Sequence, residues 1–325
     1  MPLMKLSNTH KILFITLSNI GDAILTLPVL SALKDNFPEA SIDVVVGPRP
    51  QEVFKKDPRV NRVFIYDKHA GLKDKITFIK KLKAEKYDLA IDMKTSFLPV
   101  LIGAKHRSAL LPVARSGIRH KRLIHLESLR PFELIYKQQK NIYIDDKARK
   151  KIEDILQTSG IKNTDIIIGV CPGSKSHLKQ WKRQGFADVI NSIMKNLQYK
   201  VILIGDTKEA GLSKEIAARI KQPGLIDLTG KTSLNELFAL VEKFNLLLTG
   251  DSAGMHIASD LGVKVVAIFG PTDPEEYGPR GKEDIVIRKD LKCSPCKKAQ
   301  CKFGTHECMA AISAEEVLEA IRRSI

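Results

Sequence analysis

The chain has 325 residues, of which 43% are hydrophobic and 28% are charged. This length can form two domains of ordinary size, each with its own core, and the composition is that of a soluble globular protein. No apolar stretch approaches the roughly eighteen residues that a membrane-spanning helix needs. No cleavage site follows the N-terminus, so we expect a cytoplasmic protein.

Charge is distributed unevenly along the chain. The net charge is +16, and +12 of it lies in residues 1–160. The densest point is Arg119-His120-Lys121-Arg122. Such a field attracts polyanions, whether nucleic acid, an anionic membrane surface or a phosphorylated, carboxylated substrate, although it could also be a solvated face. We expect no nucleic acid, because the segment lacks interleaved aromatics and contains no recognition-helix or finger motif.

The first half of the chain alternates predicted strands and helices. The run Lys11–Ile15 is apolar enough for a strand buried on both faces, and an apolar-periodic helix follows it to about Asn36. A Lys-rich amphipathic helix is expected from Leu72 to Glu85. Alternation of this kind predicts an α/β fold with a doubly wound parallel sheet. The other strands are predicted at 41–47, 61–66 and 87–92.

The second half repeats this plan. A helix predicted over Asp145–Ser159 ends at Gly160, which suits the residue after a helix, and we place the domain boundary there. The predicted domains are residues 1–160 and residues 161–325, the latter with a Cys-rich segment at 293–308 and a terminal helix. Further strands are expected at 166–171, 201–204, 225–227, 246–248 and 265–269, and capping boxes at Ser233-x-x-Glu236 and Ser313-x-x-Glu316.

The stretch 248–274 has the pattern of a strand, a polar turn, a helix and a second strand. In a parallel sheet such a turn lies at the carboxyl ends of the strands, and the helix that starts there presents backbone N–H groups to an anion. Asp251 is expected to cap this helix, Ser252 offers a hydroxyl, and His256 lies about one turn into the helix. The pattern predicts a phosphate-binding turn.

The sequence DSAGMHIASDLGVKVVAIFGPTDP in this stretch resembles the nucleotide-sugar signature of the bacterial heptosyltransferase family, the ADP-heptose:lipopolysaccharide transferases. The resemblance extends over nearly the whole chain. It implies the GT-B architecture, with two Rossmann-like domains facing a cleft. It also implies inverting transfer of heptose from ADP-heptose to the anionic inner core of a lipopolysaccharide precursor at the inner face of the cytoplasmic membrane. No cofactor is then required for catalysis.

Asp22 is the candidate general base. Inverting transfer requires an acceptor hydroxyl to lose its proton while it attacks the anomeric carbon. The segment Asn19-Ile-Gly-Asp22, followed by Thr26-Leu-Pro28, is similar to the N-terminal motif of the heptosyltransferases, in which the aspartate is the base. The structural alternative is that Asp22 caps a helix.

The diphosphate of the donor needs groups that bind its negative charge, and the segment after the predicted strand 166–171 offers several. The turn that contains Gly173, Ser174 and Ser176 is a plausible phosphate cradle. Lys179-Gln-Trp181 resembles the Lys-x-Trp element of the family, which assigns neutralisation of the leaving phosphates to Lys179, with Lys182 as the alternative. We expect Trp181 to belong to a core or a cleft wall.

Two further sets of residues complete the predicted site. The resemblance places either Asp206 or Glu209 on the nucleoside. It places the turn Asp251–Gly254 on the donor, although this chain has Ala253-Gly254 where many family members have Gly-Pro. His256 either contacts phosphate or is a structural ring. The basic residues expected to bind the acceptor are Arg119, Lys121 and Arg122.

Four cysteines follow one another as Cys293-x2-Cys296-x4-Cys301-x6-Cys308. In a cytoplasmic protein they should be reduced, and their spacing is compatible with a structural zinc site or, less readily, an iron–sulfur site. Cys171 is expected to be a small buried residue.

Two other interpretations stay open. One is a transferase or epimerase that uses another nucleotide sugar, and the other is a non-catalytic protein that binds nucleotide sugars or polyanions. The sequence does not specify the heptose position, the donor base or the oligomeric state.

Overall fold

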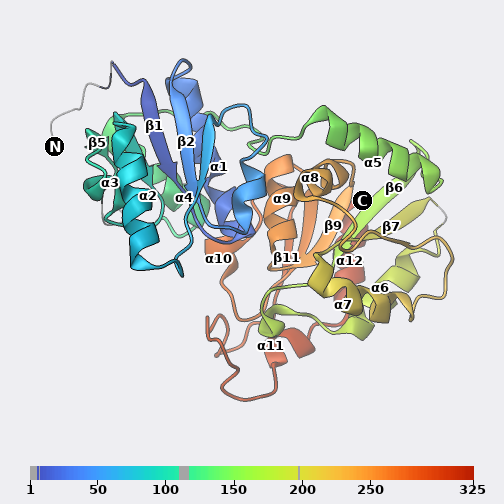
Figure 1. Ribbon diagram of the computed structural model, residues 1–325. Coiled ribbons are helices and arrows are strands. Elements are labelled where there is room, and N and C mark those ends of the chain that lie inside the picture. The colour runs from blue at the N-terminus through green and yellow to red at the C-terminus, as the bar shows by residue number, and fades with distance from the viewer. Residues whose placement is uncertain (1–5, 7, 110–116, 197) are drawn as a thin grey trace. The chain divides into compact units, whose positions relative to one another are not determined.

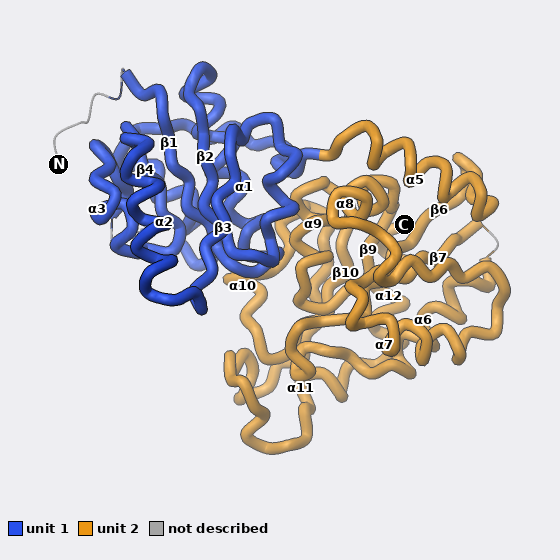
Figure 2. Tube along the Cα trace, in the orientation of Figure 1, with its two compact units in different colours: residues 1–143 blue, residues 144–325 orange. Residues whose placement is uncertain are grey.

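The computed structural model describes residues 6, 8–109, 117–196 and 198–325, and the chain divides into two compact units, residues 1–143 and 144–325 (Figures 1 and 2). The division falls one helix before the boundary predicted at residue 160, because α5 (Asp146–Thr158) packs on α8 (Leu234–Glu242) of the second unit. Arg149 Nε also lies 3.0 Å from Glu242 Oε2. None of the described helices is long and apolar enough to cross a membrane.

The described part of the first unit contains a five-stranded parallel sheet in the order β3-β2-β1-β4-β5. Strand β1 is central in this order, and its residues after Lys11 are therefore buried. The strand predictions for this unit are confirmed except for β5, which the sequence did not indicate. The strands are β1 (Lys11–Ile15), β2 (Ser41–Val46), β3 (Arg62–Ile65), β4 (Leu89–Asp92) and β5 (His106–Arg107).

Helices cover both faces of this sheet. Phe78, Ile79 and Leu82 of α2 pack on Leu13 and its neighbours, together with α3. Right-handed crossovers place α1, which connects β1 to β2, on the opposite face. The helical elements are α1 (Ile20–Asn36), η1 (Pro50–Val53), α2 (Leu72–Ala84), α3 (Leu98–Leu101), α4 (Lys121–Glu127) and η2 (Arg130–Phe132).

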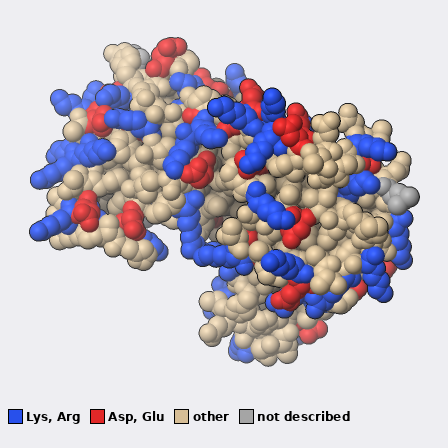
Figure 3. Space-filling model, turned by 45° about the vertical axis from the view of Figure 1, so that its right-hand side comes forward, with Lys and Arg blue, Asp and Glu red and all other residues tan. Residues whose placement is uncertain are grey.

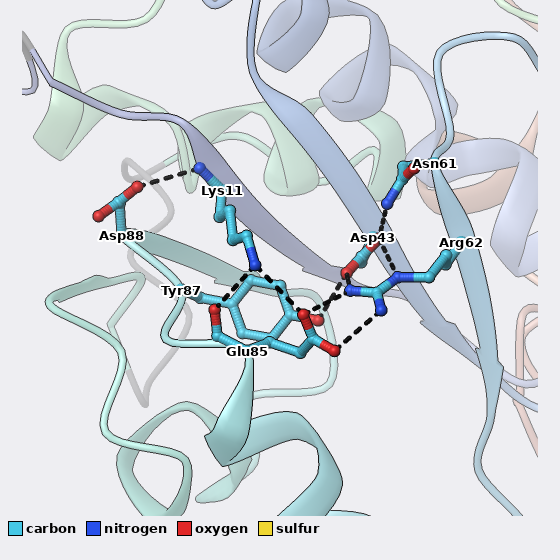
Figure 4. A network of polar contacts seen from close by, with 7 residues as sticks. All are labelled: Lys11, Asp43, Asn61, Arg62, Glu85, Tyr87 and Asp88. Atoms are coloured by element: carbon cyan, nitrogen blue, oxygen red, sulfur yellow. Dashed lines mark hydrogen bonds and ion pairs between the residues drawn. The ribbon is translucent and has the colours of Figure 1, made fainter.

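A polar network ties together the amino-terminal edge of the same sheet (Figure 4). The buried Asp43 carboxylate accepts hydrogen bonds from Tyr87 Oη at 2.8 Å and from Arg62 Nη2 at 2.6 Å. Arg62 Nη1 also donates to Glu85 Oε1 at 2.8 Å. Asp88 accepts from the backbone amide of Lys11 at 3.0 Å. These bonds join β1, β2 and β3 to the loop before β4, at the edge opposite the carboxyl ends of the strands.

The second unit is built around a six-stranded parallel sheet among its described residues, in the order β11-β10-β9-β6-β7-β8. The predicted α/β class, with two doubly wound parallel sheets, is confirmed. The strands are β6 (Ile166–Cys171), β7 (Tyr199–Leu203), β8 (Ile226–Asp227), β9 (Leu246–Gly250), β10 (Lys264–Ile268) and β11 (Ile285–Ile287).

Two helices of this unit, α8 and α12, begin where the sequence signals indicate. Both predicted capping boxes are present, at the starts of α8 and α12, with Ser233 and Ser313 as N-caps. Trp181 is 3% exposed, packs edge-on against Phe186 and donates from Nε1 to the carbonyl of Ile312. Its assignment to the core is confirmed. The remaining helical elements are η3 (His177–Lys179), α6 (Arg183–Ile193), η4 (Thr207–Glu209), α7 (Ala210–Ala217), α9 (Ala253–Leu261), α10 (Pro274–Tyr277), α11 (Glu307–Ala310) and α12 (Ala314–Ser324).

Candidate active site

Each sheet has one point at which the strand order reverses. In the second unit it lies between β6 and β9, which pair in register with Cys171 opposite Thr249. In the first unit it lies between β1 and β4, with Ile15 opposite Asp92. The connections that leave the carboxyl ends of two such strands diverge to opposite sides, and the crevice between them is where α/β sheets bind ligands. The candidate residues are therefore sought at these two points.

Lys179 and Asp251 form an ion pair at the reversal point of the second unit. Lys179 Nζ lies 2.6 Å from Asp251 Oδ2, and the side chains are 30% and 8% exposed. The hydroxyl of Ser174 donates to the backbone carbonyl of Asp251 at 3.1 Å. The structure thus joins the loop after β6 to the loop after β9 through three residues predicted for the site. The ion pair holds an ammonium group, partly open to solvent, beside the start of α9.

The start of α9 differs from the prediction in one respect. Ser252, not Asp251, occupies the N-cap position, and its side chain makes no capping bond. The prediction that Asp251 caps this helix is wrong, because its carboxylate is turned to Lys179. The Ser252 hydroxyl instead lies 2.9 Å from Thr249 Oγ1. The first backbone N–H groups of a helix have no partner within the helix, so this turn offers donors to an anion.

Space is tight where these loops approach each other. A Cβ atom on Gly254 would lie 3.2 Å from Cys171 Sγ, and one on Gly250 would lie 3.1 Å from the carbonyl oxygen of Lys179. Cys171 is buried as expected, and burial raises the pKa of its thiol to about 12. It is therefore a neutral packing group at physiological pH.

Glu209 and Asp206 lie at the end of the neighbouring strand, β7. Asp206 is the N-cap of η4, and its Oδ1 accepts from the amides of Lys208 and Glu209. Glu209 Oε2 in turn accepts a hydrogen bond from the backbone amide of Asp206 at 2.8 Å, which completes a capping box. Burial raises the pKa of Glu209 above its usual value. The Asp-x-x-Glu spacing carries the signal for this box, which our sequence interpretation missed.

Glu209 also faces the turn after β6. A Cβ atom on Gly173 would lie 1.9 Å from Glu209 Oε1, so a side chain at Gly173 would displace that carboxylate. The structure thus brings Gly173 and Glu209 together, next to the Lys179–Asp251 pair along the same sheet edge. Ser176 is the partly exposed N-cap of η3, and its side chain makes no capping bond.

Two candidate residues, His256 and Lys182, do not lie at the exposed edge of the sheet where a ligand would bind. The ring of His256 is 7% exposed within α9. Lys182, the alternative to Lys179, is exposed and points its Nζ to the carbonyl of Ala310 at 3.5 Å. Of the two lysines, Lys179 lies at the ligand-facing edge.

In the first unit Asp22 follows β1 at the reversal point. The helix N-cap is Asn19, so the alternative in which Asp22 itself caps α1 is wrong. Asp22 lies in the first turn, is partly exposed, and its Oδ2 accepts from Asn19 Nδ2 at 2.8 Å. A carboxylate held at one oxygen and open to solvent can accept a proton from a bound hydroxyl.

The basic segment next to Asp22 forms helix α4, which packs against α1. His120 caps α4 by accepting from the amide of Arg122, whose guanidinium donates to Tyr136 Oη at 2.9 Å. Burial lowers the pKa of His125 to about 4, while Asp22 opposes this shift and Lys121 adds to it. His125 is thus a neutral ring within electrostatic reach of both Asp22 and Lys121, and no sequence signal distinguished it from other histidines.

Of the residues expected to bind an acceptor, Lys121 thus shares the neighbour His125 with Asp22. Arg119 is exposed just before α4, and Arg122 is partly buried within it. The described residues of the first unit thus combine a partly exposed carboxylate with a basic helix packed beside it.

The four C-terminal cysteines are all thiols, and Cys293 is exposed. They lie near one another, since the other three contribute to raising the pKa of Cys308, after burial as the main cause. Within the described ranges, which contain all four, no group of three or more His, Cys, Asp or Glu side chains is arranged to hold a metal ion. The thiols as placed do not form a zinc site, and a structural metal stays a prediction.

Comparisons with known proteins agree on one family. The model of glycosyltransferase family 9 (heptosyltransferase) matches residues 119–306, more than half of the chain. Lipopolysaccharide heptosyltransferase 3 of Escherichia coli K12 is 29% identical over 286 residues, which cover 80% of this chain and 82% of that protein. Among solved structures, a family 9 glycosyl transferase from Veillonella parvula is 26% identical with a TM-score of 0.83, covering 99% of this chain and 98% of that one. The ADP-heptose lps heptosyltransferase II of E. coli is 22% identical with a TM-score of 0.75, covering 97% and 98%, and the likeness confirms the GT-B class.

Proposed function

The chain belongs to glycosyltransferase family 9 and is therefore a glycosyltransferase, and we propose that it transfers heptose from ADP-heptose to the inner core of a lipopolysaccharide precursor. The curated relatives named as heptosyltransferases of lipopolysaccharide or lipooligosaccharide support this substrate class. The acceptor carries Kdo or heptose on lipid A, and its phosphates and carboxylates suit the basic first unit. Transfer occurs with inversion.

The observation that carries the proposal is the Lys179–Asp251 pair at the start of α9. In the proposed complex the diphosphate of the donor lies on the first N–H groups of α9, and Lys179 neutralises the charge that develops as ADP leaves. The ion pair holds the Nζ of Lys179 2.6 Å from Asp251 Oδ2, so this cation is positioned at the sheet edge before a donor binds. Asp251 then shares Lys179 with the diphosphate and accepts from a hydroxyl of the sugar. No metal ion is needed at such a site.

The residues around this pair supply the rest of the proposed donor site. Gly173, Ser174 and Ser176 line the diphosphate, and the Ser252 hydroxyl and the backbone of Ala253 and Gly254 complete the turn. Glu209, rather than Asp206, binds the ribose hydroxyls, because Oδ1 of Asp206 is already occupied by two backbone amides. His256, buried beneath the turn, supports it without contacting the ligand.

Asp22 is the proposed general base. Its carboxylate takes the proton from the acceptor hydroxyl as that oxygen attacks the anomeric carbon, and the C–O bond to the diphosphate breaks on the opposite side. Arg119, Lys121 and Arg122 attract the anionic acceptor to this unit. We also propose that the enzyme works in peripheral contact with the inner face of the cytoplasmic membrane, where such a lipid acceptor would be found.

The proposal is tested by measuring nucleotide release from a panel of donors. ADP-heptose, UDP-glucose and GDP-mannose are each offered with Kdo-lipid A and with its heptosylated product. We expect turnover with ADP-heptose and one of the two acceptors. Turnover with another donor would replace the proposed substrate, and tight donor binding without turnover on either acceptor would favour a protein that only binds nucleotide sugars.

A further inference from the structure

Helix α2 of the first unit carries apolar side chains that the sheet does not cover. Phe78, Ile79 and Leu82 pack into the core, but Leu72 and Ile76, at the start of the helix, are 76% and 44% exposed. Leu72, Ile76 and Lys80 follow one another in steps of four residues and therefore form one row along the helix. The apolar part of this row protrudes into solvent at the end of α2 that follows β3.

Helix α3 adds a second uncovered set on the same face of the sheet. Phe97, Val100 and Leu101 are 69%, 40% and 52% exposed, while Leu98 and Ile102 pack on the core. Helices α2 and α3 contact each other, and Figure 1 shows them side by side. We call the five exposed residues, Leu72, Ile76, Phe97, Val100 and Leu101, the α2–α3 surface.

Lysines surround this surface. Residues 68–105 contain nine lysines and four acidic residues. Three of these acids already accept hydrogen bonds within the unit, Glu85 from Arg62, Asp88 from Lys105 and Asp92 from Ser96. Lys68, Lys73 and Lys80 are all exposed around α2. In the face shown in Figure 3, basic side chains are likewise more widespread than acidic ones.

We propose that the α2–α3 surface docks on an anionic lipid bilayer. Large apolar side chains within a ring of lysines match the two requirements of interfacial binding, burial at the acyl boundary and attraction of cationic groups to anionic headgroups. The lysine stems lie along the apolar surface while their ammonium groups stay at the phosphates. The inference rests on the proposed function for its biological sense, since it specifies the surface that makes the proposed membrane contact.

The composition of the surface favours a lipid bilayer over the two other kinds of partner that bind basic apolar surfaces, nucleic acid and protein. Phe97 is the only aromatic residue among the five, so the surface lacks a stacking platform for single-stranded nucleic acid. A stable protein interface has a core depleted in charge, whereas here lysines alternate with the apolar residues along α2 itself. A lipid headgroup layer accommodates that alternation, because it offers phosphate and acyl chain within a few ångströms.

The test is co-sedimentation of the full chain with vesicles of phosphatidylcholine, with and without phosphatidylglycerol. We expect binding to the mixed vesicles that weakens with salt. The triple variant Leu72→Ser/Phe97→Ser/Leu101→Ser should lose affinity by roughly tenfold or more. The pair Lys73→Gln/Lys80→Gln should lose about fivefold for each lysine.

Matched controls come from the second unit. Phe303→Ser removes a side chain that is 63% exposed, and Lys147→Gln/Lys150→Gln removes two exposed lysines on α5. These variants should bind vesicles like the wild type, and thermal melts should show all the variants folded. Equal binding of the surface variants and the controls, or equal binding of the wild type to neutral and anionic vesicles, would overturn the inference.

A second measurement separates this inference from the proposed function. With a deacylated, water-soluble acceptor, the surface variants should turn over like the wild type, since no membrane is needed. If the wild type shows no turnover but the vesicle results are as expected, the substrate assignment fails and the docking surface stands. If turnover is normal but the variants bind vesicles fully, the docking surface fails and the enzyme assignment stands.

Discussion

The two units place different chemistry at equivalent points of similar sheets. In the second unit the loops after β6 and β9 are bonded to each other through Lys179, Ser174 and Asp251, and the Asp251 carboxylate is 8% exposed. In the first unit the carboxylate of Asp22 is held at one oxygen by Asn19 and is otherwise partly open. The polar network around Asp43 lies at the opposite edge of the sheet of the first unit (Figure 4).

This difference agrees with the proposed roles of the two units, in which the second unit binds the nucleotide sugar and the first unit binds the acceptor. A nucleotide sugar is a fixed ligand, and a site built for it gains from groups that are already in position before binding. A lipid-linked acceptor is larger and varied, and a partly exposed carboxylate beside a basic helix can accept it without a closed pocket. The first unit also carries most of the excess positive charge, +12 of +16, which suits attraction over long range.

Removal of the base should have the largest effect. Asp22→Asn keeps the size of the side chain and its contact with Asn19 but cannot take a proton, so we expect turnover to fall about 10²- to 10⁴-fold. Steady-state ADP release measures this change, and donor affinity, measured by calorimetry, should stay the same. Asn19→Ala is the companion variant, expected to lower turnover by a smaller factor because the base is then less well positioned. A turnover in Asp22→Asn within threefold of wild type would exclude Asp22 as the base.

Breaking the ion pair of the second unit should come next. Lys179→Met removes the cation that faces the diphosphate, and we expect kcat to fall about a hundredfold. The buried Asp251 carboxylate then lacks its partner, which should lower the free energy of unfolding by about 1–3 kcal/mol. The double variant Lys179→Met/Asp251→Asn should regain stability without regaining turnover. Equal stability of the single and double variants would contradict a structural role for the pair.

The predicted strands and helices followed local patterns, and most of them are where the sequence places them. The site was harder, because its key contacts are distant in sequence. Lys179 and Asp251 are 72 positions apart, and only the pairing of β6 with β9 brings them together. The proximity of His125 to Asp22 depends in the same way on the packing of α4 against α1.

Other differences had local causes. The Asp206–Glu209 capping box could have been recognised in the sequence from its Asp-x-x-Glu spacing. We instead considered the two residues as alternative ligands for the nucleoside, not as partners of each other. The strands β5 and β11 were not predicted, and they have only two and three residues. The domain boundary was placed after α5 because Gly160 ends that helix, whereas packing on α8 assigns α5 to the second unit.

Two glycine substitutions test whether the proposed donor site of the second unit depends on the contact between Gly173 and Glu209. In Gly173→Ala the new Cβ would lie 1.9 Å from Glu209 Oε1, so the carboxylate must move, and we expect a loss of about 1–3 kcal/mol in stability with weaker donor binding. Gly211→Ala in α7 is the matched control, because no atom lies within 4 Å of its Cβ position. It should be neutral or stabilising by up to about 1 kcal/mol. Thermal melts with and without ADP measure both effects, and similar behaviour of the two variants would mean that Glu209 does not depend on Gly173.

The smallest effect should be the pH dependence of stability in the first unit. The hydrogen bond from Arg62 is the main cause that lowers the pKa of Glu85 to about 2, and burial lowers that of His125 to about 4. In both cases the folded unit binds fewer protons than the unfolded chain, so stability falls with falling pH. His125 contributes this loss between about pH 6.5 and 4, and Glu85 between about pH 4.5 and 2.

Melting temperatures measured across this range check the assignment. His125→Gln should reduce the change of melting temperature between about pH 6.5 and 4, and Glu85→Gln should reduce it between about pH 4.5 and 2. The two variants serve as controls for each other. Unchanged curves in both would mean that neither group is coupled to folding.

The burial of Trp181 has a spectroscopic consequence. It is the single tryptophan of the chain, 3% exposed, with its indole N–H bonded to Ile312 and its ring against Phe186. Intrinsic fluorescence excited at the red edge of the protein absorption therefore reports on residues 144–325 alone, whereas circular dichroism sees both units. The difference between the two unfolding curves isolates the first unit in the intact protein, without labels or truncation.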